Sequence, residues 1–188
     1  LVMPTWRSWL EDQSDETFRQ SSYYREYAAL LNDPKLREFL HQTHTELIFY
    51  IHPKLREYIS AFHADDPLIR LIPFGSVPLN QLIMKCSMLI TDYSSVSWDV
   101  YYLGKPILFY QFDLDKYNET NGSYIDMEKD LFGERCLTRE ELLPKIHEYY
   151  ENDFKEKTAY AEMRKKYLAY HDHNNSRRTY EFIKDQGY

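Results

Sequence analysis

The chain has 188 residues, of which 43% are hydrophobic and 16% aromatic, so it is long enough and apolar enough for one domain with a sizeable core. Its formal net charge of −7 disfavours nonspecific binding to nucleic acid, although a local basic pocket for an anionic ligand is compatible with an acidic protein. Neither a disulfide framework nor a membrane-spanning helix is expected, because Cys86 and Cys136 form no CxxC pair and no stretch approaches ~20 apolar residues.

Strands and helices are expected to alternate through the first two thirds of the chain, after a polar loop at 5–15. Apolar runs bounded by turn residues predict strands at 1–3, 46–51, 69–72, 88–91 and 107–110. Helical spacing and capping residues predict helices at 23–31, 33–44, 54–62, 78–86 and 94–103. This alternation predicts an α/β fold with a Rossmann-like parallel sheet and helices on both faces, whose ligands bind outside the carboxyl ends of the strands.

The last third is expected to be mostly helical. Residues 111–137 are rich in Asp, Asn, Gly and Tyr and are interpreted as a long loop, a feature that is often functional in compact domains. Thr138 and Glu141 form a capping box that opens a helix to about Tyr150. Two further helices are expected in the tail, at 154–170 and 177–184, packed across the sheet. The chain is therefore interpreted as a single domain, 1–188, with helices 139–188 packed on it.

The unit from Met88 to Tyr110 carries the strongest chemical signal. Ser94 or Ser95 can cap the helix that follows its first strand, and Gly104 suits the position just past that helix. Free N–H groups and the helix dipole at such a helix start favour anions, and small hydroxyl side chains add further donors. The arrangement suits a diphosphate. The alternative is that the serines only cap the helix, as serine does at many helix starts without a ligand.

Four motifs in chain order resemble one known family. They are MPTWR at 3–7, IHP at 51–53, LITDYSS at 89–95 and KPILFY at 105–110, followed by Asp113 and Tyr117. Together they resemble the CDP-glycerol glycerophosphotransferase family, the teichoic-acid and capsule polymerases of bacteria. The resemblance implies a GT-B architecture of two Rossmann-like halves, of which this chain is similar to the C-terminal, donor-binding half. Leu1 falls within the opening strand, so the sequence is expected to be a segment of a longer protein that also has an N-terminal acceptor half.

The resemblance also implies roles for individual residues. Ser94 and Ser95 would hold the donor diphosphate, and Asp99 would bind the ribose hydroxyls. The expected donor-binding residues are Arg7, Pro73, Phe74, Gly75, Ser76, Thr91, Asp92, Ser94, Ser95 and Asp99, with Pro73 to Ser76 beside the cytosine. His52 is the expected catalytic residue, because an imidazolium at a strand end can contact phosphate or stabilise the departing CMP.

Two of these residues, His52 and Arg7, also have a purely structural interpretation. A histidine before a proline at a strand end, as in His52-Pro53, is also a common structural feature. The planar guanidinium of Arg7 suits a phosphate, but an arginine after a buried tryptophan can equally pair with a surface carboxylate. Asp113 and Asp115 imitate a metal-binding DxD signature, but isolated DxD is common and no metal is expected.

The sequence departs from the family pattern at two places. Family members commonly carry an Arg-Gly-Phe-like element where this chain has Asn121-Gly122-Ser123-Tyr124, so an amide replaces an arginine that would contact phosphate. A later proline-glycine-proline-like stretch is replaced by Leu131-Phe132-Gly133-Glu134, which alters the expected rim of the cleft. Donor affinity or donor identity is therefore expected to differ from the family pattern.

The implied function is transfer of glycerol phosphate, or a related polyol phosphate, from a CDP-activated donor to a growing teichoic acid or capsular polymer. This chain would supply donor binding and be inactive as an isolated half. The implied partners are a CDP-polyol donor, a lipid-linked polyol-phosphate or polysaccharide acceptor and the N-terminal half, with no cofactor and no nucleic acid, at the cytoplasmic face of the cell membrane. Two alternatives stay open: a noncatalytic nucleotide-binding or assembly module, and a GT-B transferase that uses a nucleotide sugar.

Overall fold

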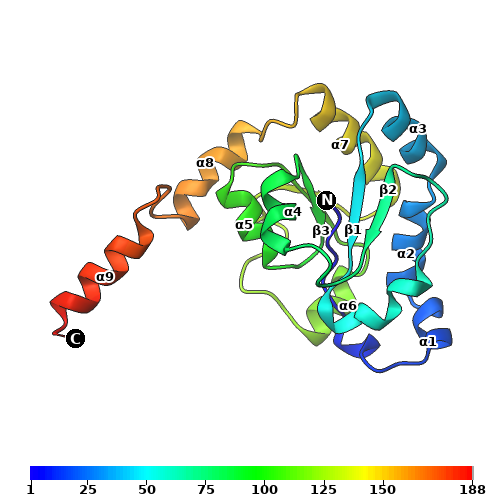
Figure 1. Ribbon diagram of the computed structural model, residues 1–188, viewed down its shortest axis with the longest axis horizontal. Coiled ribbons are helices and arrows are strands. Elements are labelled where there is room, and N and C mark those ends of the chain that lie inside the picture. The colour runs from blue at the N-terminus through cyan, green and yellow to red at the C-terminus, as the bar shows by residue number, and fades with distance from the viewer. Residues whose placement is uncertain (188) are drawn as a thin grey trace.

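The computed structural model describes residues 1–187, in which short strands and helices alternate (Figure 1). The strands are β1 (Leu47–Tyr50), β2 (Ile69–Ile72), β3 (Leu89–Thr91), β4 (Ile107–Tyr110) and β5 (Glu134–Cys136). The α-helices are α1 (Asp15–Gln20), α2 (Ser22–Leu31), α3 (Pro34–Thr43), α4 (Leu79–Lys85), α5 (Val96–Tyr102), α6 (Leu114–Thr120), α7 (Arg139–Glu151), α8 (Thr158–Tyr167) and α9 (Asn175–Asp185). Two 3₁₀ segments, η1 (Ser8–Leu10) and η2 (Pro53–Ala61), complete the set.

The extended segment at Val2 joins the strands into one parallel sheet. Val2 forms parallel bridges with Phe49 of β1 on one side and with Ile90 of β3 on the other. β1 pairs with β2, and β4 pairs with both β3 and β5, all in parallel. The order β2-β1-Val2 segment-β3-β4-β5 is that of a doubly wound Rossmann-like sheet, and the order reverses between the Val2 segment and β3. The predicted fold class is confirmed, and the reversal marks where a ligand is expected.

The sheet separates two apolar cores because side chains alternate along each strand. Ile90 and Leu108 point into a core built with α2, α3, η2 and α7. Leu89 and Phe109 point into a second core, built with α4, α5 and the segment before β5. In Figure 1, α2, α3 and α7 accordingly lie on one side of the strands and α4 and α5 on the other. Helices cover both faces, as expected.

Local capping signals set several helix boundaries where the sequence predicts them. The Asp33 carboxylate accepts hydrogen bonds from the backbone N–H groups at the start of α3. The Thr138 hydroxyl accepts from the N–H of Glu141, as the predicted capping box requires, but the Glu141 carboxylate accepts from the N–H of Leu137, one residue before the N-cap position. Gly104, with φ of +70°, follows the last turn of α5 in the left-handed conformation that glycine adopts readily.

Short elements are where the structure differs from the expectation. The expected loop at 111–137 contains helix α6 and strand β5, and α1 begins where the polar loop at 5–15 was expected to end. β5 has three residues and is defined by its pairing with β4, which no local pattern reveals. The helix expected at 54–62 is a 3₁₀ segment with a kink at Leu55.

The tail only partly packs on the domain. In α8, Tyr160, Met163 and Tyr167 pack against the core beside α5, and Arg164 donates to the backbone oxygen of Tyr101. In α9, by contrast, no residue is buried, and Figure 1 shows it projecting from the body of the molecule. The expectation that both tail helices pack across the sheet is therefore wrong for α9, which has the predicted helical residues but buries none of them. No helix in this described range is long and apolar enough to cross a bilayer.

Candidate functional site

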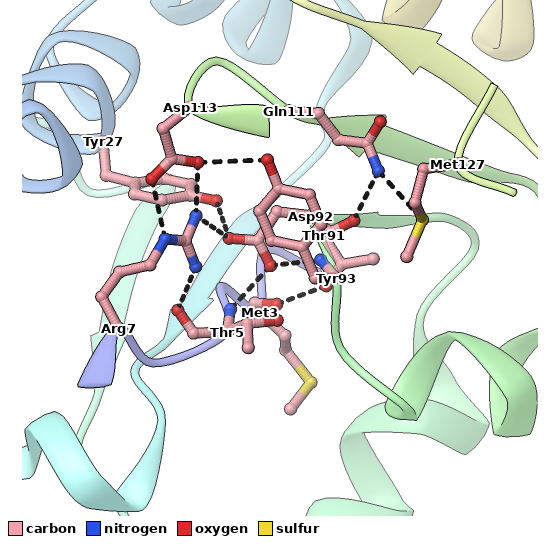
Figure 2. A network of polar contacts seen from close by, with 10 residues as sticks. All are labelled: Met3, Thr5, Arg7, Tyr27, Thr91, Asp92, Tyr93, Gln111, Asp113 and Met127. Carbon is pink, nitrogen blue, oxygen red and sulfur yellow. Dashed lines mark hydrogen bonds and ion pairs between the residues drawn. The ribbon is translucent and has the colours of Figure 1, made fainter. Parts of the chain in front are cut away.

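A buried ion-pair network lies at the carboxyl ends of the Val2 segment, β3 and β4 (Figure 2). The Arg7 guanidinium is fully buried, and its Nε and Nη2 donate to the two oxygens of Asp113 over 2.8 and 2.9 Å. Nη2 also donates to Asp92 Oδ2 over 2.8 Å, and Nη1 donates to the backbone oxygen of Thr5. The guanidinium therefore ties the segment after Val2 to the ends of both neighbouring strands.

Aromatic rings and a second set of hydrogen bonds enclose this network. The Arg7 Cζ lies 4.9 Å from the ring centre of Tyr93 and 5.3 Å from that of Tyr117, which suits a cation–π contact. Burial alone would lower the pKa of the guanidinium, but Asp92 and Asp113 outweigh it and the net shift is upward. Burial raises the pKa of the Tyr93 phenol, and both carboxylates add to the rise, so the phenol stays protonated and donates to Asp113.

Three of the residues expected to bind donor are instead structural. Arg7 is enclosed and engaged with protein carboxylates, so neither a phosphate contact nor a surface ion pair fits it. Asp92 is fully buried, and besides Arg7 its carboxylate accepts from the N–H groups of Thr5 and Tyr93 and from the Tyr27 hydroxyl. Thr91 is also fully buried, and its hydroxyl donates to the backbone oxygen of Met3. We therefore reassign these three side chains to support of the loop that carries Ser94.

The loop from Asp92 delivers Ser94 and Ser95 to the start of α5. The Ser94 hydroxyl accepts from the N–H of Val96 over a long 3.4 Å, while no side-chain cap bond is made by Ser95, the residue at the N-cap position. Ser94 therefore caps the helix only weakly, as one of the two serines was expected to do. Both serines line a cavity of about 300 Å³ between α5 and the segment that leads to β5.

His52 lies just past the end of β1, beside the same edge of the sheet. Its Nδ1 accepts from the N–H of Lys54, and its ring stacks on Trp6 with 6.2 Å between ring centres. Burial lowers the pKa of the imidazole; the charge of Asp92 opposes this shift and that of Lys54 adds to it, leaving a net downward shift. The half-buried imidazole is therefore neutral near pH 7 in the absence of a ligand.

The turn after β2 and the acidic residue of α5 are both accessible. The hydroxyl and N–H of Ser76 bond the backbone oxygen of Pro73, closing a turn in which Phe74 is 48% exposed and Gly75 has φ of +83°. Asp99 is exposed in the first turn of α5 and follows Ser95 by four residues, so the two share one face of the helix. Neither the turn nor Asp99 lines the cavity beside Ser94.

Residues 1–187 contain no group of three or more His, Cys, Asp or Glu side chains placed to share a metal ion. The Asp113 carboxylate of the DxD-like sequence is occupied by Arg7 and Tyr93, whereas Asp115 is exposed. The cysteines, Cys86 and Cys136, are both free thiols.

Sequence reasoning missed how Arg7 and Asp113 are joined, because they are 106 positions apart. It also missed Gln111, a buried side chain whose amide donates to the backbone oxygen of Asp92 and to Met127 (Figure 2). The sequence did contain one signal for this network. Asp92 and Asp113 both follow apolar strands of a predicted parallel sheet, and the carboxyl ends of such strands lie at one edge. Two carboxylates buried side by side at that edge require a cation between them.

Comparison with known proteins relates this chain to one family. The model of the CDP-Glycerol:Poly(glycerophosphate) glycerophosphotransferase family matches residues 1–185. The minor teichoic acid biosynthesis protein GgaB of Bacillus subtilis (strain 168) is 29% identical over 97% of this chain, and the teichoic acid glycerol-phosphate primase of the same strain is 31% identical over 58% of it. The chain spans 21% and 28% of the lengths of these two relatives.

Solved structures of the wall teichoic acid polymerase TagF share the fold. One aligns with 98% of this chain and 42% of its own, with a TM-score of 0.66 and 20% identity. Another, of a TagF variant after a 30 minute soak with CDPG, has a TM-score of 0.59 and 20% identity over the same shares.

Proposed function

The chain belongs to the CDP-glycerol:poly(glycerophosphate) glycerophosphotransferase family, and from this premise we propose that it binds the CDP-activated donor for a polyol-phosphate transferase. The transferred group is glycerol phosphate or a related polyol phosphate, and the acceptor is a growing, lipid-linked teichoic acid or capsular polymer at the cytoplasmic face of the membrane. The part of the protein outside this chain supplies the acceptor side and the base that deprotonates the acceptor hydroxyl. This domain, 1–188, supplies the donor side.

The observation that carries the proposal is the convergence of small polar groups where the strand order reverses. Ser94 and Ser95 follow β3, which lies next to the Val2 segment, and His52 follows β1 on its other side. Backbone N–H groups and hydroxyls at such a point suit phosphate oxygens. The Arg7 network supports the loop that carries the serines, and both serines line a cavity.

The remaining donor contacts follow from this placement. With the diphosphate at Ser94 and Ser95, Asp99 lies one turn further along α5 and is proposed to accept hydrogen bonds from the ribose hydroxyls. The accessible turn from Pro73 to Ser76 is proposed to lie beside the cytosine, where the exposed ring of Phe74 offers a stacking surface.

Calorimetric titration of the 188-residue chain with CDP-glycerol, CDP-ribitol, CMP and a UDP-sugar tests the proposal. We expect a CDP-polyol to bind best and the Ser94→Ala/Ser95→Ala variant to lose at least about tenfold in affinity, because hydrogen bonds to charged groups contribute about 1.5–3 kcal/mol each. Ser60→Ala is the matched control, since Ser60 is an exposed serine on η2. Preference for the UDP-sugar, or equal affinity in the double variant, would contradict the proposal.

His52 is proposed to contact the donor phosphates and to stabilise the departing CMP as an imidazolium. Its pKa is lowered in the free protein, so a neighbouring diphosphate must raise that pKa and draw a proton from solution. Binding of a CDP-polyol should therefore weaken as pH rises from about 6 to 8, and its enthalpy should depend on the ionisation enthalpy of the buffer. The His52→Gln variant should show neither effect. Buffer-independent enthalpies in the unaltered protein would count against this role.

A second candidate, a noncatalytic nucleotide-binding or assembly module, is favoured by two observations. The Arg7 guanidinium is paired with Asp92 and Asp113, so it is not available to a donor phosphate. Asn121 lines the cavity where the family pattern would supply an arginine. Turnover distinguishes the two candidates: a full-length protein that binds CDP-glycerol but transfers nothing to a polyol-phosphate acceptor would establish the module, and transfer would exclude it.

A further inference from the structure

The cavity beside Ser94 has two walls made of paired aromatic rings. Tyr93 and Tyr117, which both line it, stack with 3.7 Å between ring centres and an 11° angle between planes. Trp98 of α5 and Phe132 also line it and lie against each other, with 4.2 Å between ring centres. The cavity volume is about 300 Å³, the size of a small organic group. The pairs come from segments far apart in sequence, so the cavity is a product of the tertiary fold.

The lining is neutral as far as the structure describes the chain. Of the residues around the cavity, all within 93–132, not one carries a charged side chain, although 28% of the residues of the chain are charged. Anionic ligands are normally met by arginine, lysine or several N–H groups. A phosphate group seated deep in this cavity would lack such a cation, so its occupant is expected to be uncharged.

Small polar groups stand at the mouth of the cavity. The hydroxyls of Ser94 and Ser95 border it from the start of α5, and the side-chain amide of Asn121 borders it from the end of α6. Asn121 and Ser95 are exposed, so their donors and acceptors are accessible to a ligand. Aromatic walls with a few hydroxyl and amide groups match a molecule that has apolar C–H faces and several hydroxyls.

We propose that this cavity binds a neutral polyhydroxylated group, either the polyol at the end of the donor or a sugar unit of the acceptor. The inference rests on the proposed function in one respect: it takes the donor diphosphate to lie at Ser94 and Ser95, at the cavity mouth. The group beyond the diphosphate then enters the space between the two aromatic pairs, while the nucleotide extends toward His52 and the turn after β2. Asn121 acts as a specificity-determining residue that bonds hydroxyls of the entering group.

The three tryptophans of the chain supply separate NMR signals for this test. The indole N–H of Trp98 reports on the cavity, that of Trp6 reports on the surroundings of His52, and that of Trp9, which lies beneath Lys116, is an internal control. Glycerol, ribitol, N-acetylglucosamine and CMP are titrated separately into the 188-residue chain. Glycerol or ribitol binding most tightly identifies the polyol of the donor, and N-acetylglucosamine binding most tightly identifies a sugar of the acceptor.

We expect the neutral probes to shift Trp98 and not Trp6, and CMP to shift Trp6. Asn121→Ala should weaken binding of the best neutral probe about threefold to tenfold, the loss expected for a net hydrogen bond. Asn118→Ala, which removes an exposed amide from the same helix outside the cavity, should not weaken it. A silent Trp98 with every neutral probe, or a Trp98 that responds to CMP as strongly as to ribitol, would overturn the inference.

The two proposals fail differently in this experiment. If CMP shifts the Trp6 signal and no neutral probe shifts that of Trp98, donor binding is supported and polyol binding in the cavity is contradicted. If ribitol shifts the Trp98 signal, while no tryptophan responds to CMP and calorimetry detects no nucleotide binding, polyol binding in the cavity is supported and donor binding is contradicted.

Discussion

Arg7→Met should lower the free energy of unfolding by about 3–5 kcal/mol, the loss expected when one partner of a buried ion pair is removed. Methionine fills much of the space but leaves the Asp92 and Asp113 carboxylates without their shared cation, in a place where both are almost fully enclosed. Since small domains have total free energies of unfolding of only about 5–15 kcal/mol, this substitution should remove a large part of the stability of the protein. Urea unfolding followed by circular dichroism measures the change.

Arg56→Met is the matched control, because Arg56 is exposed and the same change of side chain there should alter stability by less than about 0.5 kcal/mol. A double substitution tests the cause. Asp113→Asn removes one of the two uncompensated charges, so Arg7→Met/Asp113→Asn should be more stable than Arg7→Met alone, although it carries one more substitution. A loss of less than about 1 kcal/mol in Arg7→Met would mean that the network is hydrated or open.

This network shows where sequence reasoning succeeds and where it stops. The apolar strands Ile69–Ile72 and Ile107–Tyr110 were predicted with their observed bounds, because turn residues and prolines flank them closely. The position of Ser94 at a helix start next to β3 was also predicted from local signals. The role of Arg7 was not, since the carboxylates that occupy it are 85 and 106 positions away and no local pattern records such a contact.

The same reasoning explains the tail. The residues of α9 favour a helix, and its position was predicted within a few residues. Whether a helix packs depends on a complementary surface elsewhere, which the helix sequence does not contain. A sequence therefore indicates elements and the ends of strands at which ligands gather, while burial of an individual polar side chain depends on the tertiary partners it meets.

Gly133→Ala should lower the free energy of unfolding by about 3 kcal/mol, through steric overlap with the backbone. A Cβ at Gly133 would lie 2.4 Å from the backbone oxygen of Ile107 and 3.0 Å from the Phe109 ring, and neither atom belongs to a flexible chain end. The φ of Gly133 is outside the left-handed region, so the backbone conformation tolerates a side chain and steric overlap is the only cause of the expected loss. The overlap is relieved only if β5 moves away from β4. This movement also displaces the neighbouring Phe132, which packs against Trp98 in the wall of the cavity.

Gly75→Ala separates crowding from backbone strain. Gly75 has open space around its Cβ position but a φ of +83°, so alanine there should cost only about 1–2 kcal/mol, from conformation alone. Urea unfolding of both variants should rank Gly133→Ala as the less stable, and only Gly133→Ala should move the Trp98 indole signal in the free protein, because only it displaces Phe132. If the two variants were equally stable with an unmoved Trp98, the close packing of β5 on β4 would be wrong, and the aromatic wall that depends on it would lose its support.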